Sequence, residues 1–261
     1  MPLSQQTTTA IHNYLLGELT RYIADGKAKE EPRITKPFHA RLLPDLFDVP
    51  LSERSFSTRS GTWWQQIARL VALQFHSHAE LGYRLHGRIK PAAAQHVDEI
   101  IRQLNTAGRR KPIRQVDNDE VSTVQSPDGD AASEVADLFI RTHDGEELYF
   151  EIKTATPNKD TSKAMKRFIL RIGAMCKGTN ASAFAATAYN PYGEGNAYKW
   201  NYALQFLEVG QDLLIGSAFW NKIGDDSTFD ELLAIAHDVG HKLKPLVDQA
   251  IGEYKAMHQE L

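Results

Sequence analysis

The stretch DLFIRTHDGEELYFEIKT, which begins at Asp137, constrains the fold more than any other, because two apolar runs flank an Asp-Gly pair. Asp-Gly between runs of alternating hydrophobicity is the strongest short-range signal for a β-hairpin. The runs VADLFI (135–140) and ELYFEIKT (147–154) are therefore expected to form antiparallel strands. Because side chains alternate across a strand, Glu151 and Lys153 share one face, and Asp137 on the partner strand can approach Glu151.

The remaining chain predicts helices around this hairpin. Apolar residues recur at helical spacing in five segments, namely residues 8–25, 57–75, 92–105, 162–177 and 228–258. Two more strands are expected at 182–190 and 212–220, and the polar segment 115–132 is expected to be an irregular loop. Strands enclosed by helices predict an α/β fold, in which a mixed central β-sheet is flanked by helices with helical additions at both ends.

No repeat or linker divides the sequence, so we expect residues 1–261 to form one domain. Within it, residues 1–110 are expected to be mainly helical, residues 111–225 to form the sheet core and residues 226–261 to form C-terminal helices. The sheet is expected to carry Asp137, Glu151 and Lys153 at its edge.

The composition excludes several classes of protein. No run approaches the roughly 18 apolar residues that span a bilayer, and the N-terminus lacks a secretory signal pattern. Cys176 is the only cysteine, which rules out an internal disulfide or a cluster of thiolates around a metal. We therefore expect a cytoplasmic protein with no membrane contact.

The formal net charge of −3 hides a strong separation of charge along the chain. Residues 117–151 contain eleven acids and one base, whereas residues 153–177 contain seven bases and one acid. Residues 84–114 contain eight bases and two acids. Acids beside bases suit a metal site next to a polyanion, although two solvated faces would give the same pattern.

The hairpin carries groups that suit phosphodiester hydrolysis. The carboxylates of Asp137 and Glu151, with the carbonyl of Ile152 between them in the chain, form an all-oxygen set suited to Mg²⁺. Lys153 could orient or help deprotonate a water, and its charge would offset charge on a phosphate. An exposed hairpin with charges paired across its strands is the alternative interpretation.

The helix that follows the hairpin separates into an apolar face and a basic face at 100° per residue. We predict that its basic face contacts DNA phosphates. The bases concerned are Lys159, Lys163, Lys166, Arg167, Arg171 and Lys177. An ordinary amphipathic helix with a solvated exterior remains the alternative. Cys176 falls on the apolar face and is interpreted as a core residue.

Four segments, ERSFSTRSGTWWQQIA, YFEIKTATPNKDTSKAMKRFIL, YNPYGEGNAYKWNY and LLIGSAFWNKIGDDSTFDELL, occur in this order between residues 53 and 235. Together they resemble the TdeIII-type group of type II restriction endonucleases, and the hairpin resembles the PD-(D/E)xK nuclease motif. The resemblance implies a restriction-endonuclease-like core and Mg²⁺-dependent cleavage of double-stranded DNA at a GGNCC-like site. It also implies products with a 5′-phosphate and a 3′-hydroxyl. A palindromic target would imply a homodimer.

The resemblance makes Asp137 and Glu151 metal ligands and Lys153 the catalytic lysine. Ala136 stands where the motif has proline. Many relatives of the wider class add an acid from an upstream helix, where this chain has glutamines at 65 and 66, so that acid is unassigned. Glu134 is a possible substitute.

Two loops rich in polar and aromatic residues are expected to reach DNA from the scaffold. Arg59 is the candidate contact in the first loop. The second loop, 190–199, offers Asn190, Tyr192, Asn196 and Lys199, but it could equally be a turn closed by proline and glycines with aromatics packed beneath it.

Two other functions stay open. His237 and Asp238, with His241 four residues after the first histidine, resemble the motif of HD-type metal phosphohydrolases. A DNA-binding module without catalysis would keep the basic helix but would not need a carboxylate pair beside a lysine.

Overall fold

The structure is a computed structural model, and it describes residues 1–24, 53–106 and 108–259. Five strands form one sheet in the order β1-β2-β3-β4-β5. They are β1 (His78–Ile89), β2 (Asp130–Arg141), β3 (Glu147–Lys153), β4 (Ala181–Thr187) and β5 (Leu213–Ile215). The first three strands pair antiparallel, and β3, β4 and β5 pair parallel. The predicted hairpin and the predicted mixed sheet are both confirmed.

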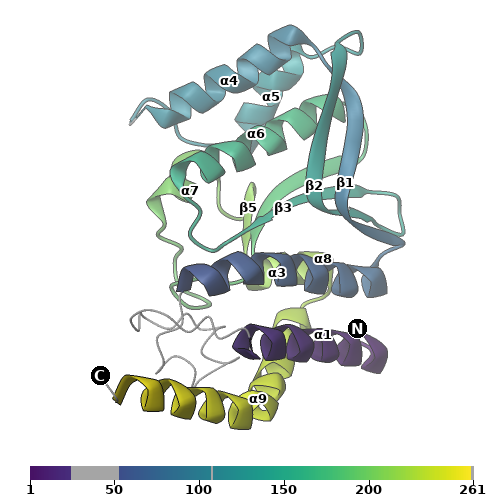
Figure 1. Cartoon of the computed structure of the whole chain (residues 1–261). Helices are drawn as coiled ribbons and strands as arrows, with labels where there is room; N and C mark the ends of the chain where they lie inside the picture. Colours follow the sequence, from purple (N-terminus) through teal and green to yellow (C-terminus); the bar gives the residue numbers. More distant parts are fainter. Residues whose placement is uncertain (25–52, 107, 260–261) are drawn as a thin grey trace.

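Helices cover both faces of the sheet (Figure 1). One face carries α4 (Pro91–Asn105), α5 (Arg114–Val124), α6 (Lys159–Met175) and α7 (Asn201–Phe206). The other face carries α3 (Glu53–Phe75) and α8 (Ser217–Ile223). Beyond α3, the helices α1 (Gln5–Ala24) and α9 (Thr228–Gln259) pack on each other and form the predicted helical additions at both ends. No helix within the described ranges combines the length and apolar character needed to cross a membrane.

The sheet separates two hydrophobic cores, and this separation orients the hairpin. Leu138 and Phe150 pack in the core on the α3 side, whereas Phe139 and Tyr149 pack in the core on the α6 side. Side chains alternate along β3, so Glu151 and Lys153, which lie two and four residues after Tyr149, face the α6 side. The apolar neighbours of those residues are what fix the strand's orientation.

The strands β1 and β2 extend well beyond β3. Their pairing runs from His78–Arg141 to Ile89–Asp130, whereas β2 pairs with β3 only between Arg141–Glu147 and Leu138–Phe150. The far half is therefore a two-stranded ribbon, residues 83–89 and 130–136, which we call the β1–β2 ribbon (Figure 1).

This ribbon twists where it leaves the sheet. Leu138 faces the α3 side, but Ala136, two residues earlier on the same strand, packs in the core on the α6 side. Gly82 lies opposite Asp137, between the pairs Leu81–Leu138 and Tyr83–Ala136, and has a φ of 64°. A left-handed residue in a strand is favourable only for glycine, so Gly82 permits the twist.

The structure differs from the expected fold in three places. The strand β1 was not predicted, because His78–Ile89 is half exposed and mixes charged, small and apolar residues. The helix α5 lies in the predicted loop 115–132, since only Asp117 and Val121 of this polar helix are buried. The segment 212–220 is a strand only over Leu213–Ile215 and continues into α8.

The predicted position of the catalytic candidates at the edge of the sheet was also wrong. Asp137 lies on β2 and both Glu151 and Lys153 lie on β3, which are the second and third of five strands. The edge strand beside them is β1, whose existence the sequence did not indicate.

We predict that Gly82→Ala destabilises the protein by about 1 kcal/mol, because an L-residue resists positive φ. A Cβ at this position meets nothing within 4 Å, so the loss would report backbone strain alone. Gly17→Ala is the control, since Gly17 lies inside α1 and alanine there should stabilise by up to about 1 kcal/mol. Chemical denaturation measures both changes, and equal stability of Gly82→Ala and the parent would contradict the strain.

Candidate active site

Asp137 occupies the fork at which β2 leaves β3. The last β2–β3 pair is Leu138–Phe150, and beyond it Asp137 Oδ2 accepts a hydrogen bond from the backbone N–H of Ile152 at 2.8 Å. The side chain thus satisfies an N–H that the ladder no longer pairs. This bond also fixes the carboxylate of Asp137 beside the end of β3.

Lys153 connects the two carboxylates at this fork. Its Nζ lies 2.9 Å from Asp137 Oδ2 and 2.8 Å from Glu151 Oε1. The exposed fractions are 33% for Lys153, 21% for Asp137 and 17% for Glu151. The three side chains predicted to act together are therefore brought together, in a place that is partly desolvated but open to a substrate.

The electrostatics of the fork favour a bound cation. Burial raises the pKa of Glu151, the nearby charge of Asp137 raises it further, and the hydrogen bond from Lys153 only partly offsets both. Burial acts to lower the pKa of Lys153, but hydrogen bonds and attraction from Glu151 and Asp137 outweigh it and raise the pKa. Two carboxylates and one ammonium leave a net negative charge there.

Glu134 is a further acid close to this pair, and its charge, after burial and the charge of Asp137, helps to raise the pKa of Glu151. Glu134, the possible substitute for a helix acid, forms an ion pair with Arg171 of α6. Across the described part of the chain, no three His, Cys, Asp or Glu side chains gather closely enough to hold a metal. The candidate metal ligands are thus the two carboxylates and the carbonyl of Ile152, and the additional acid remains unassigned.

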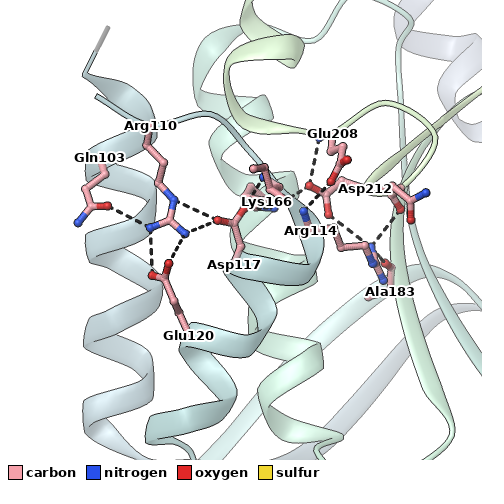
Figure 2. Close-up of polar contacts among 11 residues, drawn as sticks. Gln103, Arg110, Arg114, Asp117, Glu120, Lys166, Ala183, Glu208 and Asp212 are labelled. Carbon is pink, nitrogen blue, oxygen red and sulfur yellow. Dashed lines mark hydrogen bonds and ion pairs between the residues drawn. The ribbon is translucent and has the colours of Figure 1, made fainter. Parts of the chain in front are cut away.

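Lys166 does not lie on a DNA-contacting surface, so that prediction was wrong. Its side chain is fully buried, and its Nζ lies 2.7 Å from Asp117 Oδ2 and 2.6 Å from Asp212 Oδ2 (Figure 2). Both carboxylates are also fully buried. Because an unpaired buried charge is costly, this lysine is the counter-ion of two carboxylates from distant parts of the chain.

The polar network around Lys166 ties α5, α6 and the β4–β5 connection together (Figure 2). Arg110 forms ion pairs with both Asp117 and Glu120. On the other side, Arg114 donates from its backbone N–H to Glu208 at 2.6 Å and from its side chain to the carbonyl of Ala183 at 2.9 Å. The network fixes α6 in place, and α6 in turn covers the face that carries Glu151 and Lys153.

Most of the other predicted bases of α6 are paired within the protein. Lys163 lies 3.1 Å from Asp160, and Arg167 lies 3.0 Å from Asp98 of α4. Lys177, just after the helix, donates to the carbonyls of Ser122 and Gln125. Counting acids along the helix could not reveal Asp98 and Glu134, because these partners come from other elements. DNA contacts by Lys159, Lys163, Arg167 and Arg171 stay a prediction.

The loop 190–199 lies beside the end of β3. The hydroxyl of Tyr198 donates to the carbonyl of Ala155 at 2.7 Å, and the indole of Trp200 donates to the carbonyl of Pro157 at 2.6 Å. Both carbonyls belong to the segment that directly follows β3. The loop is therefore fixed next to the proposed site.

The four candidates in this loop differ in exposure. Asn190 is only 6% exposed and donates to the carbonyl of Asn196 at 2.8 Å, so it shapes the loop and does not offer its side chain to DNA as predicted. Tyr192 is 39% exposed, and Asn196 and Lys199 are exposed as well. These three stay candidates for DNA contacts. Arg59 lies within α3 and not in a loop as predicted, and its side chain lies outside the described residues.

The histidine motif lies on α9, which packs on α1 in the layer beyond α3, whereas the fork faces α6 (Figure 1). The rings of His237 and His241 contact each other, with 3.2 Å between their Nε2 atoms. Asp238 instead approaches His12 at 3.1 Å and Lys242 at 2.9 Å. The aspartate therefore pairs with His12 and Lys242 and does not join the two histidines.

A mixed sheet between helical layers, with two carboxylates and a lysine on adjacent strands, is the architecture of a restriction-endonuclease-like protein. The family model described as "Type II restriction endonuclease, HinfI" matches residues 3–240. The chain therefore belongs to the HinfI family of type II restriction endonucleases.

Individual relatives agree with this assignment. The chain is similar to the type II restriction enzymes HgiCII and HgiEI of Herpetosiphon aurantiacus, with 34% identity over 211 residues and 33% identity over 213 residues. Each match covers 78% of this chain and 77% of the relative. No solved structure matches the chain. The predicted activity of a site-specific deoxyribonuclease is confirmed, and neither the HD-type phosphohydrolase nor the non-catalytic module is supported.

We predict that Lys166→Met destabilises the protein by about 3–5 kcal/mol, because it leaves Asp117 and Asp212 buried without a counter-ion. Lys163→Met, on the same helix, removes an ion pair with the largely exposed Asp160 and should cost less than about 1 kcal/mol. Denaturant titration of the two variants measures the difference. Similar small losses for both would show that the buried network is not essential to stability.

Proposed function

We propose that this enzyme cuts both strands of DNA at a short palindromic, GGNCC-like site in a Mg²⁺-dependent reaction, with Asp137, Glu151 and Lys153 as catalytic residues. The observation that carries the proposal is the position of Lys153 Nζ, within hydrogen-bonding distance of both carboxylates at the β2–β3 fork. Membership of the restriction endonuclease family supports the reaction class. The GGNCC-like target rests on the resemblance to the TdeIII-type group.

The residues at the fork fit Mg²⁺. This ion takes oxygen ligands, and proteins commonly bind it through one or two carboxylates together with water and substrate phosphate. Asp137, Glu151 and the carbonyl of Ile152 provide such a set, and the net negative charge of the fork would attract it. When bound, Mg²⁺ polarises a phosphoryl oxygen and lowers the pKa of a water molecule.

The protein's own groups would each perform a separate task. The N–H of Ile152 holds the Asp137 carboxylate in one orientation, which preorganises the site. The ammonium of Lys153 would stabilise the charge that develops on the phosphate during attack, and would position the attacking water. Glu151, on the same face as Lys153, would supply the second carboxylate ligand to the metal.

We predict that the purified enzyme with Mg²⁺ cuts plasmid DNA into discrete fragments and that EDTA stops the cutting. Asp137→Ala and Lys153→Ala should each reduce the cleavage rate by at least about 100-fold, because the first removes a proposed metal ligand and the second removes the ammonium that would stabilise charge on the phosphate. Gel electrophoresis measures the rates, and sequencing the fragment ends identifies the target, the cut position and the terminal phosphate.

Arg141→Ala is the matched control, because Arg141 of β2 pairs with Glu147 of β3 on the same two strands but away from the fork. It should cut at close to the parent rate. DNA binding without divalent metal should persist in Asp137→Ala. Cutting by Asp137→Ala at the parent rate would refute the assignment of the site.

We predict a homodimer, because one active site per chain and a palindromic target call for two-fold symmetry. Sedimentation equilibrium should give a mass near twice the 29.3 kDa of the chain. A mass of one chain, both free and bound to a palindromic duplex, would exclude the dimer.

A further inference from the structure

The outer face of the β1–β2 ribbon carries a row of bases. Arg84, His86 and Arg88 are all exposed, and they alternate along β1 with residues that face the protein. Among the latter, Leu85 packs against the core on the α6 side and Gly87 lies against the side chain of Met175. The three bases therefore point away from the helices and into solvent.

No acid lies directly opposite the row on β2, and the acid that acts on it is Asp128 in the turn before β2, whose pKa a hydrogen bond from Ser126 lowers and the charge of Arg88 helps to lower. The residues of β2 directly opposite the three bases are Val135, Ser133 and Ala131. Within the described chain, neither arginine forms an ion pair, and His86 contacts no carboxylate. The arrangement differs from that on α6, where Lys163, Lys166, Arg167 and Arg171 each have a carboxylate partner.

The row begins at the proposed active site. Gly82 lies opposite Asp137, so Arg84 is two residues along the ribbon from the fork. At about 3.4 Å per residue, Arg84 and Arg88 lie about 7 Å and about 20 Å from that point along the strand. The two arginines are thus about 14 Å apart, which equals the axial rise of about four nucleotides of a DNA strand.

The ribbon is held rigidly enough to present these charges in fixed positions. At its far end, the side chain of Gln125 donates to the carbonyl of Arg88 at 3.0 Å and accepts from the N–H of Lys90 at 2.8 Å. Its inner face packs on α6, where Glu134 forms the ion pair with Arg171. A rigid two-stranded ribbon with a basic outer face is suited to lie against a nucleic acid.

We propose that the outer face of the β1–β2 ribbon binds the phosphate backbone of DNA on one side of the scissile phosphate, through Arg84, His86 and Arg88. The ribbon thereby sets the path of the DNA strand into the fork at Asp137. In this proposal the ribbon provides exposed positive charge for the substrate, whereas Lys163, Lys166, Arg167 and Arg171 of α6 are each paired with a carboxylate. This inference rests on the proposed active site, because the fork defines where the scissile phosphate lies.

The test is the salt dependence of DNA binding by the double variant Arg84→Gln/Arg88→Gln. Binding is measured in EDTA, over a series of salt concentrations, to one duplex that the parent enzyme cuts and to another of equal length that it does not cut. Each lost phosphate contact should reduce the slope of log K against log salt by about 0.9 in magnitude, or about 1.8 for both. Affinity should fall about tenfold or more, by the same factor on both duplexes.

The control double variant is Arg21→Gln/Arg102→Gln, which removes the same charge from α1 and α4. Arg21 pairs with Glu18, and Arg102 pairs with Glu99, both on the surface. This variant should keep the parent slope and affinity. Because the ribbon arginines are exposed, both double variants should also keep the parent's denaturation midpoint.

The outcomes separate this inference from the proposed active site. An unchanged slope for Arg84→Gln/Arg88→Gln would overturn the ribbon proposal, as would an equal loss in the control variant. A loss of affinity confined to the cleavable duplex would also overturn it, since phosphate contacts act on any sequence. Cutting by Asp137→Ala would instead refute the active site and leave the binding result intact.

Discussion

The hydrogen bond from the N–H of Ile152 to the carboxylate of Asp137 marks the point on which the rest of the structure depends. Up to Leu138–Phe150, β2 and β3 share a ladder, and after it each strand has a different partner. The strand β3 continues in parallel with β4, whereas β2 continues with β1 as the ribbon. The fork between them leaves the Asp137 carboxylate partly exposed at the end of β3 without leaving Ile152 N–H unpaired.

Lys153 and Lys166 make similar ion pairs, but the difference in their burial gives these ion pairs different roles. Lys153 and Lys166 each lie between two carboxylates at 2.6–2.9 Å. The side chain of Lys166 is inaccessible, so its charge is fully used in neutralising Asp117 and Asp212. Lys153 is one-third exposed, so water and a substrate can compete for its partners. The ion pairs of Lys166 stabilise the fold, whereas those of Lys153 are suited to a role in catalysis.

The sequence predicted those features that depend on neighbouring residues. The Asp-Gly turn and the alternation of Phe150 and Ile152 with Glu151 and Lys153 defined the hairpin and grouped the three candidate residues. The role of Lys166 could not be predicted, because its partner Asp212 is 46 residues away and polar helix α5, which supplies Asp117, gives almost no apolar pattern. Similarly, β1 has no strand pattern of its own, and its strand structure depends on pairing with β2, which the sequence does not reveal.

The distribution of charge follows from the same long-range pairing. The acids between residues 117 and 151 and the bases between 153 and 177 were expected to serve a metal and DNA separately, but Asp117 and Glu134 pair directly with bases of α6. Many of the charged side chains in these two segments therefore form ion pairs with each other within the protein. At the fork, the two carboxylates of Asp137 and Glu151 outnumber the single ammonium of Lys153, and the arginines of the row on β1 form no ion pair within the described residues. If the two proposals hold, an enzyme of modest net negative charge would offer DNA a locally positive path along the ribbon and a divalent cation a locally negative site at the fork.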